Sequence, residues 1–130
     1  MSPAKTILLI DDDCEILGSL QSVLECKGHR VLTAGDGETG MALAGSELPD
    51  LVVVDMMMPK KSGFVVIDQL KAHRGAGPKV IMMTANEGSR HRAYAEFLGA
   101  DDYLRKPFAL DHFLATVGRL CPAELEPLVS

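Results

Sequence analysis

The sequence predicts an α/β protein in which helices cover both faces of a doubly wound sheet of five parallel strands. Five short apolar runs recur along the chain, and segments whose apolar residues have helical spacing separate them. The apolar runs are continuous rather than alternating, which is typical of strands that are buried on both faces. Right-handed crossovers between parallel strands then place helices on each side of the sheet.

Each element can be located from its pattern. The expected strands cover residues 7–10, 30–33, 51–54, 80–83 and 103–104. The first helix is predicted from a single apolar face and ends near Gly28; this face contains Ile16, Leu17, Leu20, Val23 and Leu24. The later helices are centred on residues 41–43, 67–70 and 94–98, and the last covers residues 110–120. Sheets of this kind commonly have the strand order 2-1-3-4-5 of flavodoxin-like folds.

A single domain is expected over residues 1–130. The length suits one core, and the 47% content of hydrophobic residues is ordinary for a globular protein. No repeat, low-complexity tract or linker divides the chain. We expect the folded core to cover about residues 5–120 and residues 121–130 to be a tail or a truncated linker.

Composition argues against several classes of function. The net charge is −5 and no basic stripe is present, so direct nucleic-acid binding is not expected. No apolar stretch reaches the ~18 residues of a membrane span, and Asp11 to Asp13 interrupt the first apolar run, which argues against a signal peptide. A cytoplasmic protein is therefore expected. The three cysteines lack the spacing of a disulfide framework or a zinc site, and we expect small buried thiols at Cys14, Cys26 and Cys121.

Polar residues follow four of the five expected strands. Asp11 and Asp12 come after the first strand, Asp55 after the third, Thr84 after the fourth and Lys106 just beyond the fifth. In an open parallel sheet, ligands bind outside the carboxyl ends of the strands, where the strand order reverses. For a sheet of five strands this point commonly lies between strands one and three, so the three aspartates are expected to converge there.

Three converging carboxylates need compensation. Two carboxylates about 4 Å apart repel by roughly 4 kcal/mol at an effective dielectric constant near 20, so the group requires protons, a cationic partner or a metal. Lys106 supplies one positive charge. The remaining oxygen ligands suit a hard divalent ion that keeps several waters, which describes Mg²⁺ better than zinc. The sequence therefore predicts a magnesium site.

Single members of this set have simpler explanations. Asp12 or Asp13 is a candidate N-cap for the first helix. Thr84 alone would be a strand-end hydroxyl, and Lys106 alone would be a solvated surface charge. The run from Met56 to Met58 suits irregular gaps in a core better than metal binding. The joint placement of the polar residues at one edge favours a site.

Four short segments, in order and in spacing, resemble the receiver domain of bacterial two-component response regulators, a chemotaxis-regulator-like family. These segments are ILLIDDD, VVVDMMMP, IMMTAN and YLRKPF. The resemblance covers about Lys5 to Leu120, which is nearly the whole chain. It implies that Asp55 is the phosphoacceptor, that Asp11 and Asp12 hold Mg²⁺, and that the backbone carbonyl of Met57 adds a ligand.

The resemblance also implies how such a site would signal. Lys106 would pair with the acceptor and form a cis peptide with Pro107, Thr84 would bind the phosphoryl group, and Tyr103 would be an aromatic switch. The phosphoryl donor would be a sensor histidine kinase or a histidine phosphotransfer protein. A downstream effector or a second copy would bind the face formed by the fourth helix, the fifth strand and the fifth helix. The protein would be a switch that promotes its own phosphorylation and dephosphorylation, not a turnover enzyme.

Some positions depart from the family pattern. Lys61 and Ser62 stand where the family more often has an apolar residue and an aspartate, so the fit to partners is expected to differ there. Arg90, His91 and Arg92 make the start of the fourth helix basic, which is typical of a solvated face and would also suit a partner.

Two other hypotheses stay open at the level of sequence. Residues 35–40, GDGETG, match the dinucleotide-binding pattern G-x-G-x-x-G after a predicted strand, with Asp55 about 20 residues further on. However, Asp36 and Glu38 would place carboxylates in a loop meant for pyrophosphate, so Gly35 and Gly37 are better interpreted as turn residues before an Asp36 cap. The other hypothesis is a receiver-like interaction module that is never phosphorylated.

Overall fold

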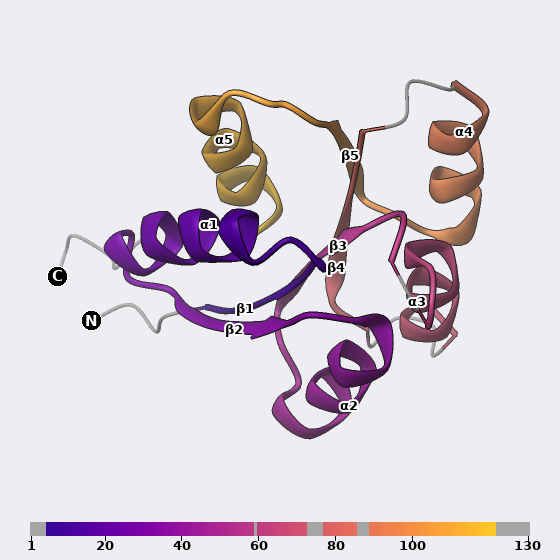
Figure 1. Ribbon diagram of the computed structural model, residues 1–130, viewed down its shortest axis with the longest axis horizontal. Helices are drawn as coiled ribbons and strands as arrows, with labels where there is room; N and C mark the ends of the chain where they lie inside the picture. The colour runs from indigo at the N-terminus through magenta and orange to yellow at the C-terminus, as the bar shows by residue number, and fades with distance from the viewer. Residues whose placement is uncertain (1–4, 59, 73–76, 86–88, 122–130) are drawn as a thin grey trace, which may run out of the picture.

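The computed structural model describes residues 5–58, 60–72, 77–85 and 89–121 (Figure 1). The strands are β1 (Thr6–Ile10), β2 (Arg30–Ala34), β3 (Leu51–Asp55), β4 (Lys79–Thr84) and β5 (Asp102–Arg105). The helices are α1 (Cys14–Cys26), α2 (Gly37–Glu47), α3 (Gly63–Leu70), α4 (Ser89–Leu98) and α5 (Leu110–Leu120). All ten predicted elements are present, and the strands extend one or two residues beyond several of the predicted bounds.

The strands form one parallel sheet in the order β2-β1-β3-β4-β5, which confirms the predicted topology. Helices α1 and α5 lie on one face of the sheet, and α2, α3 and α4 lie on the other (Figure 1). The strand order reverses between β1 and β3, which are direct neighbours. Their carboxyl ends therefore open side by side at one edge of the sheet.

The sheet separates two hydrophobic cores because alternate residues of each strand point to opposite faces. Strand side chains packed with α1 and α5 are Ile7, Leu9, Val31, Leu51, Val53, Ile81, Met83 and Leu104. Strand side chains packed with α2, α3 and α4 are Leu8, Ile10, Ala34, Val52, Val54, Val80, Met82 and Tyr103. The central strands are thus buried on both sides, as their continuous apolar runs predict, and they form a rigid base for the residues at their ends.

Local hydrogen bonds explain where several helices begin. The Asp13 carboxylate accepts from the backbone N–H groups of Glu15 and Ile16 at 2.9 and 3.4 Å, which makes Asp13 the N-cap of α1. The Ser62 hydroxyl caps α3 in the same way. The choice between Asp12 and Asp13 as a cap is therefore decided for Asp13, and Asp12 is left available for another role.

The glycines of residues 35–40 have structural roles. A Cβ on Gly37 would lie 2.6 Å from the Lys61 Cβ, and one on Gly40 would lie 2.4 Å from the Ile10 Cδ1. The Asp36 carboxylate occupies the start of α2 by accepting from the Thr39 N–H at 2.8 Å, and this bond holds the pKa of Asp36 below its ordinary value. Close packing and an acidic cap explain the pattern, so the dinucleotide hypothesis is not favoured.

The structure corrects the prediction for two cysteines. Cys14 and Cys26 are exposed, because they stand at the first and last positions of α1 and outside its apolar face. Cys121 is buried, and it packs with α1 and α5, so the described fold extends through this first residue of the expected tail. The rest of that tail, residues 122–130, lies outside the described residues. Among the helices that the structure describes, none is both long and apolar enough to cross a membrane.

Gly63, at the start of α3, touches the backbone of the proposed acceptor strand. A Cβ at this position would lie 2.4 Å from the backbone oxygen of Asp55, where no side chain can move aside. We expect Gly63→Ala to lower the free energy of unfolding by about 1–3 kcal/mol, as overpacking does elsewhere. Urea denaturation would measure this loss.

Gly45 provides the control. It lies within α2, and a Cβ there would meet nothing within 4 Å. Gly45→Ala is therefore expected to raise stability by about 0.5–1 kcal/mol. Equal effects of the two substitutions would contradict the close approach at Gly63.

Candidate functional site

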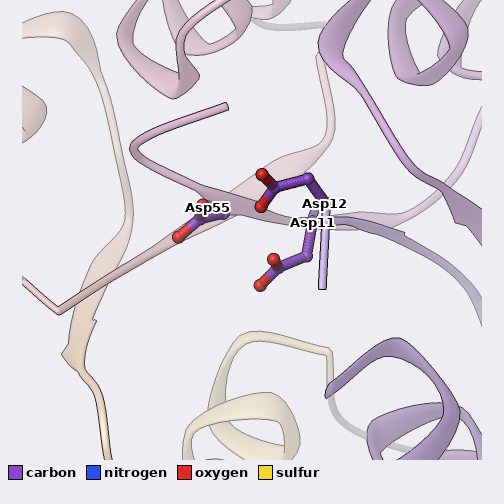
Figure 2. Close-up of side chains that lie close together, drawn as sticks. All are labelled: Asp11, Asp12 and Asp55. Carbon is purple, nitrogen blue, oxygen red and sulfur yellow. The ribbon is translucent and has the colours of Figure 1, made fainter. Parts of the chain in front are cut away.

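Three carboxylates meet at the carboxyl edge of the sheet. Ile10 pairs with Val54 in the β1–β3 register, so Asp11 and Asp55 come next along two adjacent strands. The carboxylate groups of Asp11, Asp12 and Asp55 each offer an oxygen within 4.8 Å of the others. Figure 2 shows the three side chains lying close together. The predicted convergence of these aspartates is therefore confirmed in the structure.

Lys106 connects two of these carboxylates. Its ammonium group donates to the Asp11 Oδ2 at 2.8 Å and to the Asp55 Oδ1 at 3.1 Å. The Lys106 backbone N–H donates to the carbonyl of Thr84 at 2.7 Å, which ties the loop after β5 to the end of β4. The peptide bond between Lys106 and Pro107 is cis, as the resemblance implied.

Burial differs among the three acids. Asp11 is 0% exposed and Asp55 is 6% exposed, whereas Asp12 is open to solvent. The backbone N–H of Asp13 donates to the Asp11 Oδ1 at 2.9 Å, so both carboxylate oxygens of Asp11 have partners. Asp11 is thus held firmly, and Asp12 presents its carboxylate at the open side of the group.

Burial and neighbouring charges shift the pKa values of Asp55 and Lys106. Burial, and then the nearby Asp11 carboxylate, raise its pKa above the ordinary value of 3.8, although Lys106 acts in the opposite direction. Burial by itself lowers the pKa of Lys106, but the bonds to Asp11 and Asp55 outweigh it and the net shift is upward. The pKa of Lys106 rises because two carboxylates surround it. The pKa of Asp55 rises because burial and two like charges outweigh the effect of one ammonium group.

Thr84 and Tyr103 extend the site toward β5. Thr84 is the last residue of β4 and is 1% exposed. The Tyr103 ring is buried, and its hydroxyl makes no hydrogen bond of normal geometry with a described residue. Burial raises the pKa of Tyr103, and both Arg92 and the neighbouring Thr84 side chain lower it by smaller amounts. Thr84 and Tyr103 therefore lie beside each other, as the implied switch requires.

The donor set fits a hard divalent ion. The three-residue group consists of carboxylates alone, without the histidine or cysteine that zinc prefers. One of the three is exposed, so a bound ion would keep water ligands, as Mg²⁺ does. Met57 lies in the loop just after Asp55 with its side chain 66% exposed, and the role of its carbonyl stays a prediction.

The fold and the site together define a class of protein, a doubly wound parallel α/β domain with an acidic, lysine-bridged site at its strand-order reversal. The family model for the response regulator receiver domain matches residues 7–118. The chain therefore belongs to this family, which serves two-component signalling.

Individual relatives agree with this assignment. The chain is 42% identical over 105 residues to the alkaline phosphatase synthesis transcriptional regulatory protein PhoP of Bacillus subtilis, covering 81% of this chain and 43% of PhoP. A CheY-like receiver domain structure from Methanospirillum hungatei gives a TM-score of 0.85 at 29% identity, covering 90% of this chain and 93% of that one. The structure of the BeF3-activated DrrB receiver domain gives a TM-score of 0.82 at 32% identity, covering 91% of this chain and 97% of that one. The chain spans less than half the length of the curated relatives it matches.

One contact beside the site was not predicted from the sequence. The guanidinium carbon of Arg92 lies 5.9 Å from the centroid of the Tyr103 ring. The basic start of α4 was the only signal in the sequence, and it did not show which side chain faces β5. A contact between a helix and a strand depends on packing that periodicity does not encode.

The raised pKa of Asp55 predicts that Asp55→Asn stabilises the metal-free protein. Folding raises the pKa of Asp55, so ionising it disfavours the folded state. This loss is absent below the ordinary pKa of 3.8 and is complete once the pH exceeds the raised folded-state value. The substitution removes the ionisable group and with it the loss. In EDTA, the melting temperature of the variant should exceed that of the parent by a few degrees at pH 7, and the gap should shrink as the pH falls toward about 4.

Asp68→Asn is the matched control, because Asp68 lies on the exposed side of α3. It removes the same formal charge at a residue outside the acidic group. A stabilisation at pH 7 that is equal in both variants would mean that net charge is responsible, and not the burial and local repulsion at Asp55.

Proposed function

We propose that Asp55 accepts a phosphoryl group and that this event switches the domain between two binding states. The single observation that supports this most strongly is the placement of Asp55. It ends the buried strand β3, its carboxylate accepts from Lys106 at 3.1 Å, and two further carboxylates surround it. The phosphoacceptor is thereby a fixed nucleophile with cationic and metal-binding groups around it.

The transfer needs little covalent chemistry from the protein. A carboxylate oxygen of Asp55 would attack the donor's phosphorus, forming an O–P bond as the bond from phosphorus to the donor breaks and the donor leaves with that electron pair. Catalysis of such a step consists mainly of in-line positioning and of cations around the spreading negative charge. Lys106 would supply one cation, and the Thr84 hydroxyl would donate to a phosphoryl oxygen.

Asp11, Asp12 and Asp55 are the residues that would hold Mg²⁺, with the Met57 carbonyl as a further ligand. The ion would supply charge neutralisation at the phosphoryl oxygens. Asp11 would hold the ion as a fixed, buried ligand, because its Oδ1 accepts from the backbone N–H of Asp13 and its Oδ2 accepts from Lys106. Asp12 would contribute from the open side of the group.

The phosphoryl group adds about −1.5 to −2 charge and three acceptor oxygens, which would draw Thr84 and Lys106 inward. Tyr103 would follow Thr84, and the change would reach the face formed by α4, β5 and α5. We propose a sensor histidine kinase or a histidine phosphotransfer protein as donor, and an effector or a second copy as the partner of that face. The domain would promote its own phosphorylation and dephosphorylation without being a turnover enzyme. A cytoplasmic location remains part of the proposal.

Intact mass spectrometry tests the acceptor directly. After incubation with Mg²⁺ and acetyl phosphate, the parent is expected to gain one phosphoryl group and Asp55→Ala to gain none. Asp68→Ala, which changes an exposed carboxylate on α3, should behave like the parent. No gain in the parent would favour the phosphorylation-independent module, and an equal gain in Asp55→Ala would exclude Asp55 as the acceptor.

Adjacent aspartates allow a sharp test of the metal site. Mg²⁺ should raise the melting temperature of the parent, because a ligand that binds only the folded state stabilises it. Asp12→Ala should lose most of this response. Asp13→Ala removes the cap of α1 and should cost about 1 kcal/mol of stability, yet it should keep the response to Mg²⁺. A response that survives in Asp12→Ala and disappears in Asp13→Ala would reverse the assignment.

A further inference from the structure

Arg92 covers the outer side of a buried aromatic ring. Its guanidinium carbon lies 5.9 Å from the centroid of the Tyr103 ring, within the distance at which a cation is attracted to an aromatic face. Arg92 belongs to α4 and Tyr103 to the edge strand β5, and these two elements are in contact. The contact joins an exposed helix surface to a side chain that lies beside Thr84.

The guanidinium is held in place by its own helix. The Nε of Arg92 donates to the Glu96 Oε2 at 3.1 Å, one turn further along α4. Both side chains are more than half exposed, so this ion pair adds little to stability. Its effect is orientation, because the bond uses one edge of the guanidinium and restrains the group near Tyr103.

Burial of the Tyr103 hydroxyl carries a cost that such a contact can offset. A buried hydroxyl that lacks a hydrogen bond of normal geometry disfavours burial, and among the described residues the Tyr103 hydroxyl has only the neighbouring Thr84 side chain acting on it. Packing of the ring with the core beneath α4 compensates in part. The cation above the ring supplies a further attraction that the exposed orientation would lack.

We propose that Arg92 is a positioning residue that holds Tyr103 buried beside Thr84 and thereby favours the phosphoryl-binding arrangement of the site. This inference rests on the proposed function, because it takes Thr84 as a phosphoryl ligand. If a ligand at Asp55 favours the buried ring, linkage requires that it binds more tightly when Arg92 is present. Arg92 thus sets how readily the domain switches, without touching the phosphoryl group.

The first measurement examines the ring alone. The chain has two tyrosines, so Tyr94→Phe leaves Tyr103 as the only site for 3-fluorotyrosine labelling, and ¹⁹F NMR then reports whether its ring is buried. In this background, Arg92→Ala should lower the ratio of buried to exposed ring about two- to fivefold, the size expected of a partly exposed cation–π contact. Arg92→Lys keeps a cation and should restore part of the ratio.

Arg90→Ala is the matched control, because Arg90 is an exposed arginine of the same helix two residues away. It should leave the ring as it is in the parent. If Arg92→Ala changes the ring no more than Arg90→Ala does, the inference is overturned.

The second measurement examines the coupling. With Mg²⁺ present, beryllium fluoride, a phosphoryl mimic, is titrated and the ¹⁹F signal is followed. The midpoint for Arg92→Ala should rise in proportion to the fall in the fraction of buried ring, and so by no more than the factor by which the buried ratio falls. The Arg90→Ala midpoint should not move. A ring that becomes exposed without any change in midpoint would overturn the positioning role. A parent that does not respond to beryllium fluoride counts against the proposed function, and the first measurement still decides the contact between Arg92 and Tyr103.

Discussion

The ammonium group of Lys106 makes the site possible. It comes from the loop after the edge strand β5, yet it reaches the Asp11 carboxylate at the end of β1 and the Asp55 carboxylate at the end of β3. Without this bridge, two nearly fully buried carboxylates would face each other in a region of low dielectric constant. One ammonium against three carboxylates still leaves an excess of negative charge. Burial and this excess together raise the pKa of Asp55, and the excess also makes the group suitable for a divalent ion.

The backbone around Asp55 is closely packed. The three residues before Asp55 are fully buried, with one core above the sheet and one below. Gly63 packs against the backbone of Asp55, and the backbone N–H of Met56 donates to the Met83 carbonyl at 2.8 Å. This packing holds the like charges close together, and Lys106 offsets part of their repulsion. At a site held in this way, we expect a change of charge to move side chains and not the backbone.

The side chains that could move lie toward β5. Thr84 ends β4, Tyr103 lies beside it on β5, and Arg92 reaches over the Tyr103 ring from α4. On the other side, Asp102 of β5 forms an ion pair with Arg119 of α5. Side-chain contacts thus connect β5 to both helices of the face that we propose as the output surface. A change at Asp55 can reach this face through a short chain of adjacent groups.

The sequence by itself determined the fold and the composition of the site. Continuous apolar runs specify strands buried on both faces, and a parallel sheet brings the residues after its strands to one edge, so Asp11, Asp55 and Lys106 were predictable as neighbours. Only the tertiary structure decided which acid is buried, which aspartate caps α1, why Gly37 and Gly40 must be glycine, and that Arg92 covers Tyr103. The physical reason is that periodicity and strand ends are local properties of the chain, whereas burial and contacts depend on how distant segments pack.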